Sequence, residues 1–240
     1  MSLTLASFGQ KIAHTIRSFT LSPRSVPTAT FHIREVTVPV GNDRTRDLLT
    51  SCDLLMQSFP DITAEIDNYV SAVKPYRRSM TEDAEEFLDW LARRPNLSDA
   101  QRDTIICQQS RFTIEFVAMK QQLAHVRFQE LLSNNARLAD ELPRNGCIFV
   151  HLNPAHVWAS LDTHTFVDEL TPVPARILFY QVARSIQGAV IEDDLMPLLN
   201  QLREMPQRVR NLRWTLSQLS HIEFIAVLRE LARLGIIALG

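Results

Sequence analysis

The sequence predicts an α+β protein with a mainly helical N-terminal domain and a small winged-helix-like C-terminal module that carries a short antiparallel sheet. Three observations predict this class. Only 6 of the 240 residues are glycine, which favours helices over tightly turned β structure. Apolar residues recur at helical spacing over most of residues 42–132. Strand-like runs come later, at 147–152, 176–183 and 188–191, and helical patterns follow them.

The N-terminal half begins with a predicted strand and continues as helices. Residues 31–38 include alternating apolar and β-branched positions, which predict a short strand. Apolar residues spaced three and four apart predict helices over 42–59 and 62–73. A third helix is expected from about residue 81, because acidic residues in a first turn are favoured by the helix dipole. These segments belong to a predicted helical domain over residues 1–140.

The clearest predicted helix starts at Ser98. Ser98 and Gln101 have the spacing of a capping box, in which each side chain bonds to a backbone amide at the helix start. Neither proline nor glycine interrupts the pattern before about residue 132, so a straight helix would be about 50 Å long. Its apolar positions predict a buried stripe and a spine for the domain: Ile105, Phe112, Phe116, Met119, Leu123 and Val126.

The C-terminal module is expected over residues 147–240, after a polar linker at 134–146. Its strands are predicted at 147–152, 176–183 and 188–191, with irregular structure and a possible helical turn over 153–174. Ser220 and Glu223 form a second capping box, which predicts that the last helix starts at about His221. This helix is expected to end at Gly235.

Composition excludes several classes of protein. The net charge of −2 gives no electrostatic footprint for nucleic acid. Three widely spaced cysteines without a CxxC pair predict reduced thiols rather than a disulfide framework or a zinc ribbon. No run approaches about 20 apolar residues, and the N-terminus lacks the pattern of a secretory signal. A cytoplasmic protein with neither membrane nor nucleic acid as partner is expected.

No catalytic motif is visible in the chain. It contains no P-loop, no GxGxxG and no GxSxG elbow. His151, His156 and His164 lie close together in sequence, but their spacing does not favour convergence on one metal ion. An independent metalloenzyme built on them is therefore the least favoured hypothesis, and no catalytic residue or metal ligand is predicted in this chain.

The strand at 176–183 is the first candidate binding site. It is apolar on both faces, so it is covered on both sides or has a partner on one of them. If an edge of the small sheet is open, a peptide can add to it as a further strand. The candidate peptide-binding residues are Leu178, Phe179, Tyr180, Gln181, Val182 and Val190.

A cluster of arginines is the second candidate. Arg203, Arg208, Arg210 and Arg213 lie within eleven residues, beside Trp214. They could contact phosphates, or they could bind carboxylates of a peptide or partner protein through bidentate pairs, or they could form a solvated loop. Arg208, Arg210 and Arg213 are the predicted contacts for a peptide or partner.

The alternative function is that of a winged-helix DNA-binding regulator, with the last helix in the major groove. Residues 176–240 contain eight arginines against six acidic residues, a net charge of only +2. The last helix offers Arg229, Arg233 and His221 against Glu223 and Glu230. This composition makes it a poor reader of base edges, so a peptide is favoured over DNA.

Several segments together resemble a known family. Residues 48–76, 85–103, 149–158 and the terminal module are similar to the MbnC-type accessory subunits of methanobactin biosynthesis and to the related HvfC/BufC-type proteins. The terminal module also resembles RiPP recognition elements, whose strand edge holds the leader of a precursor peptide. The broader family tends to have a histidine directly before the residue matched by Pro154, where this chain has Asn153.

The resemblance implies a non-catalytic partner subunit. Such a chain would bind the leader of a precursor peptide and would pair with an iron-containing barrel enzyme of the MbnB type. The complex would use oxygen to convert peptide cysteines into oxazolone and thioamide groups. The resemblance places the iron in the partner enzyme, so no cofactor is expected in this chain.

Overall fold

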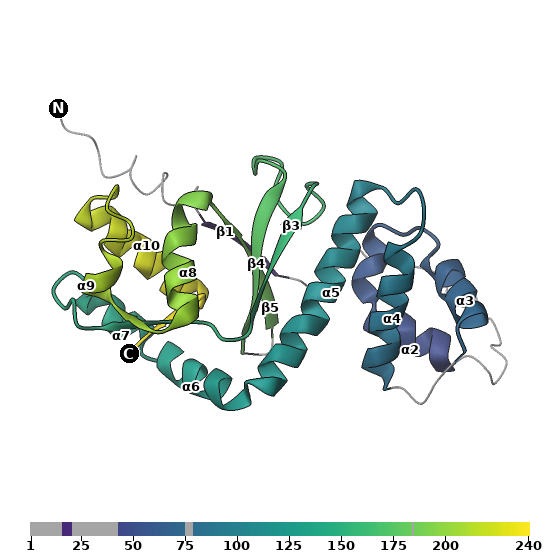
Figure 1. The fold of residues 1–240 in the computed structure, drawn as a ribbon, viewed down its shortest axis with the longest axis horizontal. Coiled ribbons are helices and arrows are strands. Elements are labelled where there is room, and N and C mark those ends of the chain that lie inside the picture. The colour runs from purple at the N-terminus through teal and green to yellow at the C-terminus, as the bar shows by residue number, and fades with distance from the viewer. Residues whose placement is uncertain (1–15, 21–42, 75–78, 184) are drawn as a thin grey trace, which may run out of the picture. The chain divides into compact units, whose positions relative to one another are not determined.

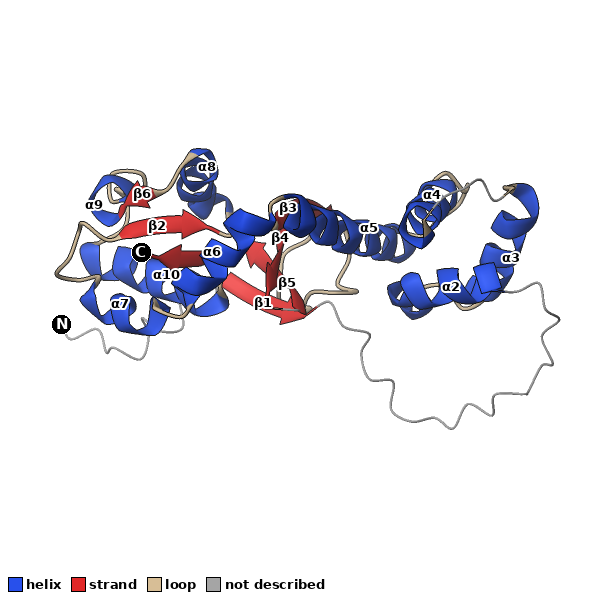
Figure 2. Ribbon diagram, turned by 90° about the horizontal axis from the view of Figure 1, so that it is seen from below, coloured by secondary structure: helices blue, strands red, loops and turns tan. Residues whose placement is uncertain are grey.

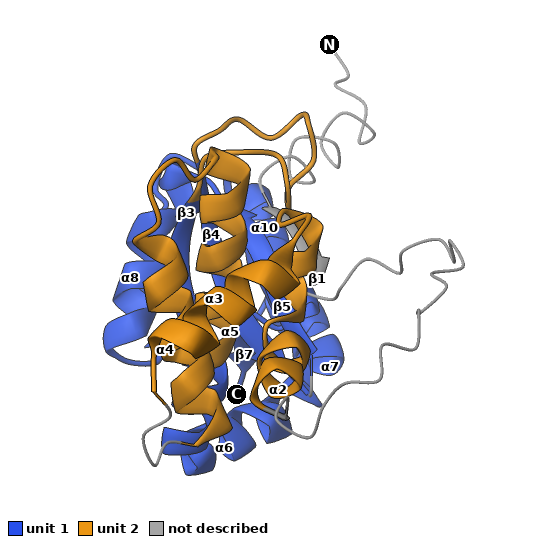
Figure 3. Ribbon diagram, turned by 90° about the vertical axis from the view of Figure 1, so that its right-hand side faces the viewer, with its two compact units in different colours: residues 1–20, 113–160, 175–240 blue, residues 21–112, 161–174 orange. Residues whose placement is uncertain are grey.

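The computed structural model describes residues 16–20, 43–74, 79–183 and 185–240, which form helices and two small sheets. Figure 2 shows both kinds of element, and the predicted α+β class is confirmed. The predicted strand at 31–38 lies outside the described residues. Contacts divide the chain into two compact units, coloured separately in Figure 3. Among the described residues, unit 1 has 16–20, 113–160 and 175–240, and unit 2 has 43–112 and 161–174.

Unit 2 is built from helices. Its elements are α2 (Asp43–Ser51), a 3-10 helix (Asp53–Gln57), α3 (Ile62–Ala72), α4 (Met80–Ala92) and the first part of α5 (Asp99–Lys120). Asp61 caps α3 by accepting a hydrogen bond from Ala64 N–H, and Ser79 forms a capping box with Glu82 at the start of α4. The inward faces of these helices form one apolar core, as their sequence periodicity predicts.

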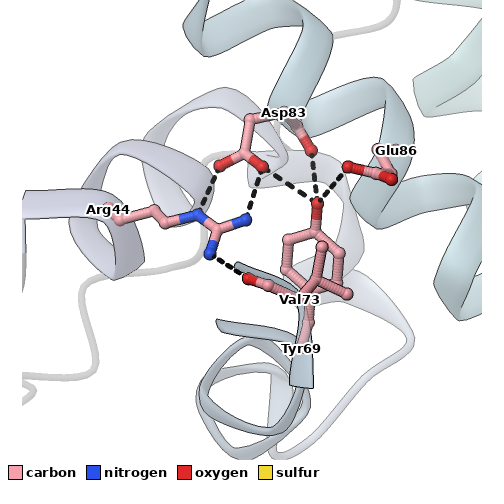
Figure 4. Close-up of polar contacts among 5 residues, drawn as sticks. All are labelled: Arg44, Tyr69, Val73, Asp83 and Glu86. Atoms are coloured by element: carbon pink, nitrogen blue, oxygen red, sulfur yellow. Dashed lines mark hydrogen bonds and ion pairs between the residues drawn. The ribbon is translucent and has the colours of Figure 1, made fainter. Parts of the chain in front are cut away.

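A polar network joins the three short helices (Figure 4). Arg44 on α2 forms a two-pronged ion pair with Asp83 on α4, with N–O distances of 2.7 Å, and its Nη1 donates to Val73 O at 2.6 Å. The same guanidinium lies over the ring of Tyr69 on α3, 5.0 Å from its centre. The Tyr69 hydroxyl donates to Asp83 Oδ1 at 2.9 Å, with Glu86 Oε2 at 3.2 Å. The network fixes the mutual packing of α2, α3 and α4.

The buried carboxylate of Asp103 on α5 holds the connection over residues 161–174 in place. Asp103 is fully buried and accepts hydrogen bonds from the backbone N–H groups of Asp162 and Thr163, at 2.9 and 2.7 Å. The Thr163 hydroxyl donates to the same carboxylate at 2.6 Å. Because a buried charge is costly unless it is hydrogen-bonded, these three bonds explain how the carboxylate is accommodated.

Unit 1 combines helices with both sheets, and Figure 1 labels the strands of the larger one, β1, β3, β4 and β5. Its helices are the rest of α5, α6 (Gln122–Leu132), α7 (Asn135–Glu141), a 3-10 turn (Asp193–Leu195), α8 (Met196–Glu204), α9 (Val209–Leu212) and α10 (His221–Leu234). Its strands are β1 (Ile16–Thr20), β2 (Phe149–Leu152), β3 (His156–Leu161), β4 (Ala175–Val182), β5 (Ser185–Ile191), β6 (Gln207–Arg208) and β7 (Ile237–Leu239).

The first sheet has the strand order β1-β5-β4-β3. Strands β4 and β5 form an antiparallel hairpin in which Phe179 is opposite Gly188 and Ile177 is opposite Val190. On its other side, β5 pairs antiparallel with β1. The two predicted strands of the module, 176–183 and 188–191, are therefore confirmed, and both are interior strands of this sheet.

The second sheet has the order β6-β2-β7. Strand β2 pairs antiparallel with β7, with Val150 opposite Leu239, and with the two-residue β6 on its other side. α10 starts with the predicted Ser220–Glu223 capping box and ends at Gly235, whose φ of 76° is left-handed. The chain then turns back so that β7 packs against α10 in the main core.

The long predicted helix is wrong in two respects. Gln121 leaves helical geometry, with φ −104° and ψ 30°, so α5 and α6 are separate helices. Its predicted buried stripe also divides, because only the first two positions, Ile105 and Phe112, are buried. The exposed fractions of the later positions are large: 48% for Phe116, 67% for Met119, 81% for Leu123 and 47% for Val126. The apolar spacing predicted one buried stripe. In the described part of the chain, the second half of that stripe, at the end of α5 and on α6, is exposed.

Candidate peptide-binding surface

The predicted peptide-binding strand has no open edge. β4 lies between β5 and β3, and β5 lies between β1 and β4, so both strands are paired on two sides. Leu178, Phe179 and Tyr180 are at most 1% exposed. Gln181 and Val182 at the end of β4 and Val190 on β5 are half-buried. The open edge on which strand addition at 176–183 or 188–191 depends is therefore absent, because β3 and β1 occupy those edges.

The outermost strands of this sheet are β1 and β3, so each has one edge without a partner strand among the described residues. The Gln181 N–H donates to Ala155 O at 3.1 Å, which places the backbone groups of Ala155 on the β4 side. Ala155 directly precedes β3, so regular alternation along the strand would place the backbone groups of His156, Trp158 and Ser160 at the outer edge. The strand contains no proline and no lysine, two devices that commonly protect an exposed edge.

β3 lies within residues 153–174, for which irregular structure was predicted, so this part of the prediction is wrong. The Asn153–Pro154 pair marks a turn, and Val157 and Trp158 directly after it are β-formers. These signals were present, but the strand is short and half-buried on both faces, so it shows no clear alternation of apolar and polar residues.

Asn153 holds the start of β3 in place. It is fully buried, and its Nδ2 donates to Gln181 O at 2.8 Å and to Gly235 O at 3.2 Å. Its Oδ1 accepts a hydrogen bond from Ala155 N–H at 3.0 Å, and its backbone oxygen lies 2.6 Å from His156 Nδ1. Asn153 therefore connects the start of β3 to the end of β4 and to the residue that ends α10.

The second sheet offers less open edge than the first. At β7, the side chain of Asn135 occupies the outer edge, because it bonds to Leu239 N–H and to Ile237 O. The opposite edge strand, β6, has only two residues. Short strands and covered edges resist the addition of another chain, so β3 is the better candidate for a peptide.

The predicted arginine cluster does not act as one group. Arg213 donates to Leu216 O at 2.9 Å and to Leu219 O at 2.6 Å, and it lies over the ring of Phe224. The prediction that Arg213 is available to a partner is therefore wrong, because its guanidinium holds the loop before α10. Arg208 lies over Phe149, 5.1 Å from the ring centre, and Arg210 is exposed.

The three neighbouring histidines do not meet. His151 and His156 line one pocket in unit 1, whereas Nε2 of His164 in unit 2 lies 2.9 Å from Thr171 O. Burial lowers the pKa of His151 and His156 below the ordinary value. Within the described ranges, no three His, Cys, Asp or Glu side chains lie together as they would around a metal ion.

α10, the helix that the DNA-binding alternative requires, is a core helix. Six of its residues are buried: Phe224, Ile225, Val227, Leu228, Leu231 and Ala232. Of its two arginines, Arg229 donates to Ala139 O at 2.9 Å and Arg233 pairs with Glu230.

Comparison of the chain with known protein families, with characterised proteins and with solved structures finds no match in any of the three. In the described segments, no helix combines the length and the apolar character needed to cross a bilayer.

Proposed function

We propose that this chain is a non-catalytic subunit that binds the leader of a precursor peptide along β3 and presents the peptide to an iron-dependent modifying enzyme of the MbnB type. The open, uncharged edge of β3 carries this proposal. An extended peptide can satisfy the outward backbone groups of such a strand, as in other proteins that bind peptides by strand addition. The resemblance of the sequence to MbnC-type subunits supplies the class of peptide and enzyme.

The exposed apolar residues of α5 and α6 are the surface that we assign to the enzyme. Phe116 and Met119 are three residues apart on α5, and Leu123 and Val126 are three apart on α6, so each pair shares one face of its helix. Exposed apolar surface of this kind is typical of a protein interface. This surface contains none of the residues of β3, so the peptide and the enzyme would bind to different residues.

The peptide-binding proposal is tested with a substitution that removes one outward N–H group. The full chain is titrated with the leader peptide encoded by its gene neighbourhood, and the Ser160→Pro variant is compared with Ser160→Ala. Proline at this edge position removes a donor without disturbing the bonds to β4, so affinity is expected to fall about fivefold or more. The alanine control keeps the donor and should bind as the natural chain does. Equal affinity of both variants would rule out addition at β3.

The enzyme partnership is tested by co-elution of the chain with the enzyme encoded beside it. Leu123→Lys places a charge in the assigned surface and should abolish co-elution. The control, Gln122→Lys, places the same charge on the preceding residue and should not abolish it. If the natural chain neither co-elutes with that enzyme nor binds the leader peptide, the proposed function fails.

A further inference from the structure

A pocket of about 660 Å³ opens beside the start of β3, and all of its walls belong to unit 1. They come from α6, from the connection between β2 and β3, and from the end of α8. His156, the first residue of β3, lines the pocket. The pocket therefore reaches the first residue of β3. Its volume is in the range of pockets that hold small ligands or a few side chains.

The inner walls of the pocket are apolar. Phe128 and Leu202 are each 3% exposed, whereas Met205 is 59% exposed. Leu131 and Leu152 are half-buried between them. Such a surface favours an apolar side chain, because burying one removes apolar area from water.

The charged groups of the pocket favour an anion. Arg127 on α6 and Arg203 on α8 line it together with one acidic residue, Glu204. Burial lowers the pKa of the pocket's two histidines, which favours their neutral form, and the two arginines outnumber the single carboxylate. Neither arginine forms an ion pair with a carboxylate in the described part of the chain. Arginine stays charged and binds carboxylates through paired hydrogen bonds, so a ligand carboxylate matches the two arginines.

We propose that this pocket receives the part of the bound peptide next to the strand added at β3, and that it selects an acidic residue beside an apolar one. The inference rests on the proposed binding of a peptide along β3. The apolar side chain fills the space over Phe128 and Leu202. The carboxylate lies at the arginine side, where Arg127 and Arg203 neutralise it.

The test uses a library of acetylated, amidated octapeptides of the form Thr-Val-Thr-X-X-Thr-Val-Thr, in which both X positions cover all residue types. The full chain is compared with an Arg127→Met/Arg203→Met double variant and with Arg144→Met, which removes an exposed arginine outside the pocket. The natural chain and the Arg144 variant should prefer pairs of one acidic and one apolar residue. The double variant should bind those pairs about tenfold more weakly, and binding of pairs without an acid should change little.

Each outcome is decisive. The proposed selection by the pocket is supported if the natural chain prefers an acidic residue beside an apolar one and the double variant loses this preference. Binding of peptides without acidic preference, or a preference that the double variant retains, overturns the pocket but leaves peptide binding intact. Binding of no peptide overturns strand addition itself. Thermal unfolding of all variants shows whether loss of binding reflects loss of fold, and retained folding is expected because all three arginines are exposed.

Discussion

Asn135 on α7 takes the place of a further strand beside Leu239. Its Oδ1 accepts a hydrogen bond from the Leu239 N–H at 2.8 Å, and its Nδ2 donates to Ile237 O at 3.0 Å and to Ala232 O at 2.8 Å. One side chain thus bonds to the edge of β7 and to the last turn of α10. Because Asn135 is buried, water cannot replace these bonds.

Asn135→Leu should therefore lower the free energy of unfolding by about 2–3 kcal/mol, since it leaves backbone groups of β7 and α10 without partners. Urea denaturation measures the change. The control is Asn134→Ala, because Asn134 is exposed and makes no capping bond with its side chain. Equal stability of the two variants would contradict the role given to Asn135.

The two arginines near α9 should behave differently. Arg213→Met removes bonds to two loop carbonyls and is expected to cost about 1–3 kcal/mol of stability. Arg210→Met changes an exposed side chain and should stay within about 0.5 kcal/mol of the natural chain. Thermal unfolding of both variants tests the assignment. A stable Arg213 variant would return that residue to the list of possible partner contacts.

Gly235 should not tolerate a side chain. Its φ is 76°, and a Cβ there would lie 2.7 Å from Val182 Cγ2. Gly235→Ala is expected to cost about 1–3 kcal/mol, through the left-handed backbone and this close contact. Adding Val182→Ala removes the contact, so the second substitution should cost less in the Gly235→Ala background than in the natural chain. If the stability losses of the two substitutions simply add, the left-handed backbone alone accounts for the cost of Gly235→Ala.

Stability should fall at high pH because of Tyr69. Burial, with the hydrogen bond to Asp83 as the next cause, raises the pKa of Tyr69 to about 12 from the ordinary value of 10.0. The folded state therefore holds this proton more tightly than the unfolded state. Its contribution is complete below pH 10 and is lost as pH rises toward 12.

Denaturation of the natural chain and of Tyr69→Phe between pH 9 and 12 measures this contribution. The variant should be less stable at pH 9, and its stability should fall less steeply with pH. Burial also raises the pKa of Tyr180, so some pH dependence should remain in the variant. Parallel curves for the two proteins would show that Tyr69 does not titrate as described.

Local sequence signals predicted the helix ends well. The capping boxes at Ser98 and Ser220 involve residues only three apart, so a short motif contains all of their partners. Gly235 likewise marked the end of α10 because a left-handed residue is a local requirement.

Features that depend on distant partners could not be predicted in this way. The neighbour of β4 is a short strand whose pairing is set by the tertiary fold, so periodicity alone could not show which edge is open. The apolar face from Phe116 to Val126 was visible in the sequence, but a pattern does not say what covers it. The bonds of Arg213 likewise depend on how the loop before α10 folds.

The carboxylate of Asp103 bonds to a loop that connects two neighbouring strands of the other unit. The chain therefore leaves unit 1 after residue 160 and returns at 175, so that neither unit is one continuous stretch of sequence. The predicted domain boundary between residues 140 and 147 remains a prediction. A fragment that begins at 147 would lack α6 and α7, and with α7 it would lack Asn135, whose side chain bonds to the edge of β7. Protein produced for binding studies should keep residues 113–240 together with the helices before them, since a shorter fragment would expose the core of the unit that carries β3.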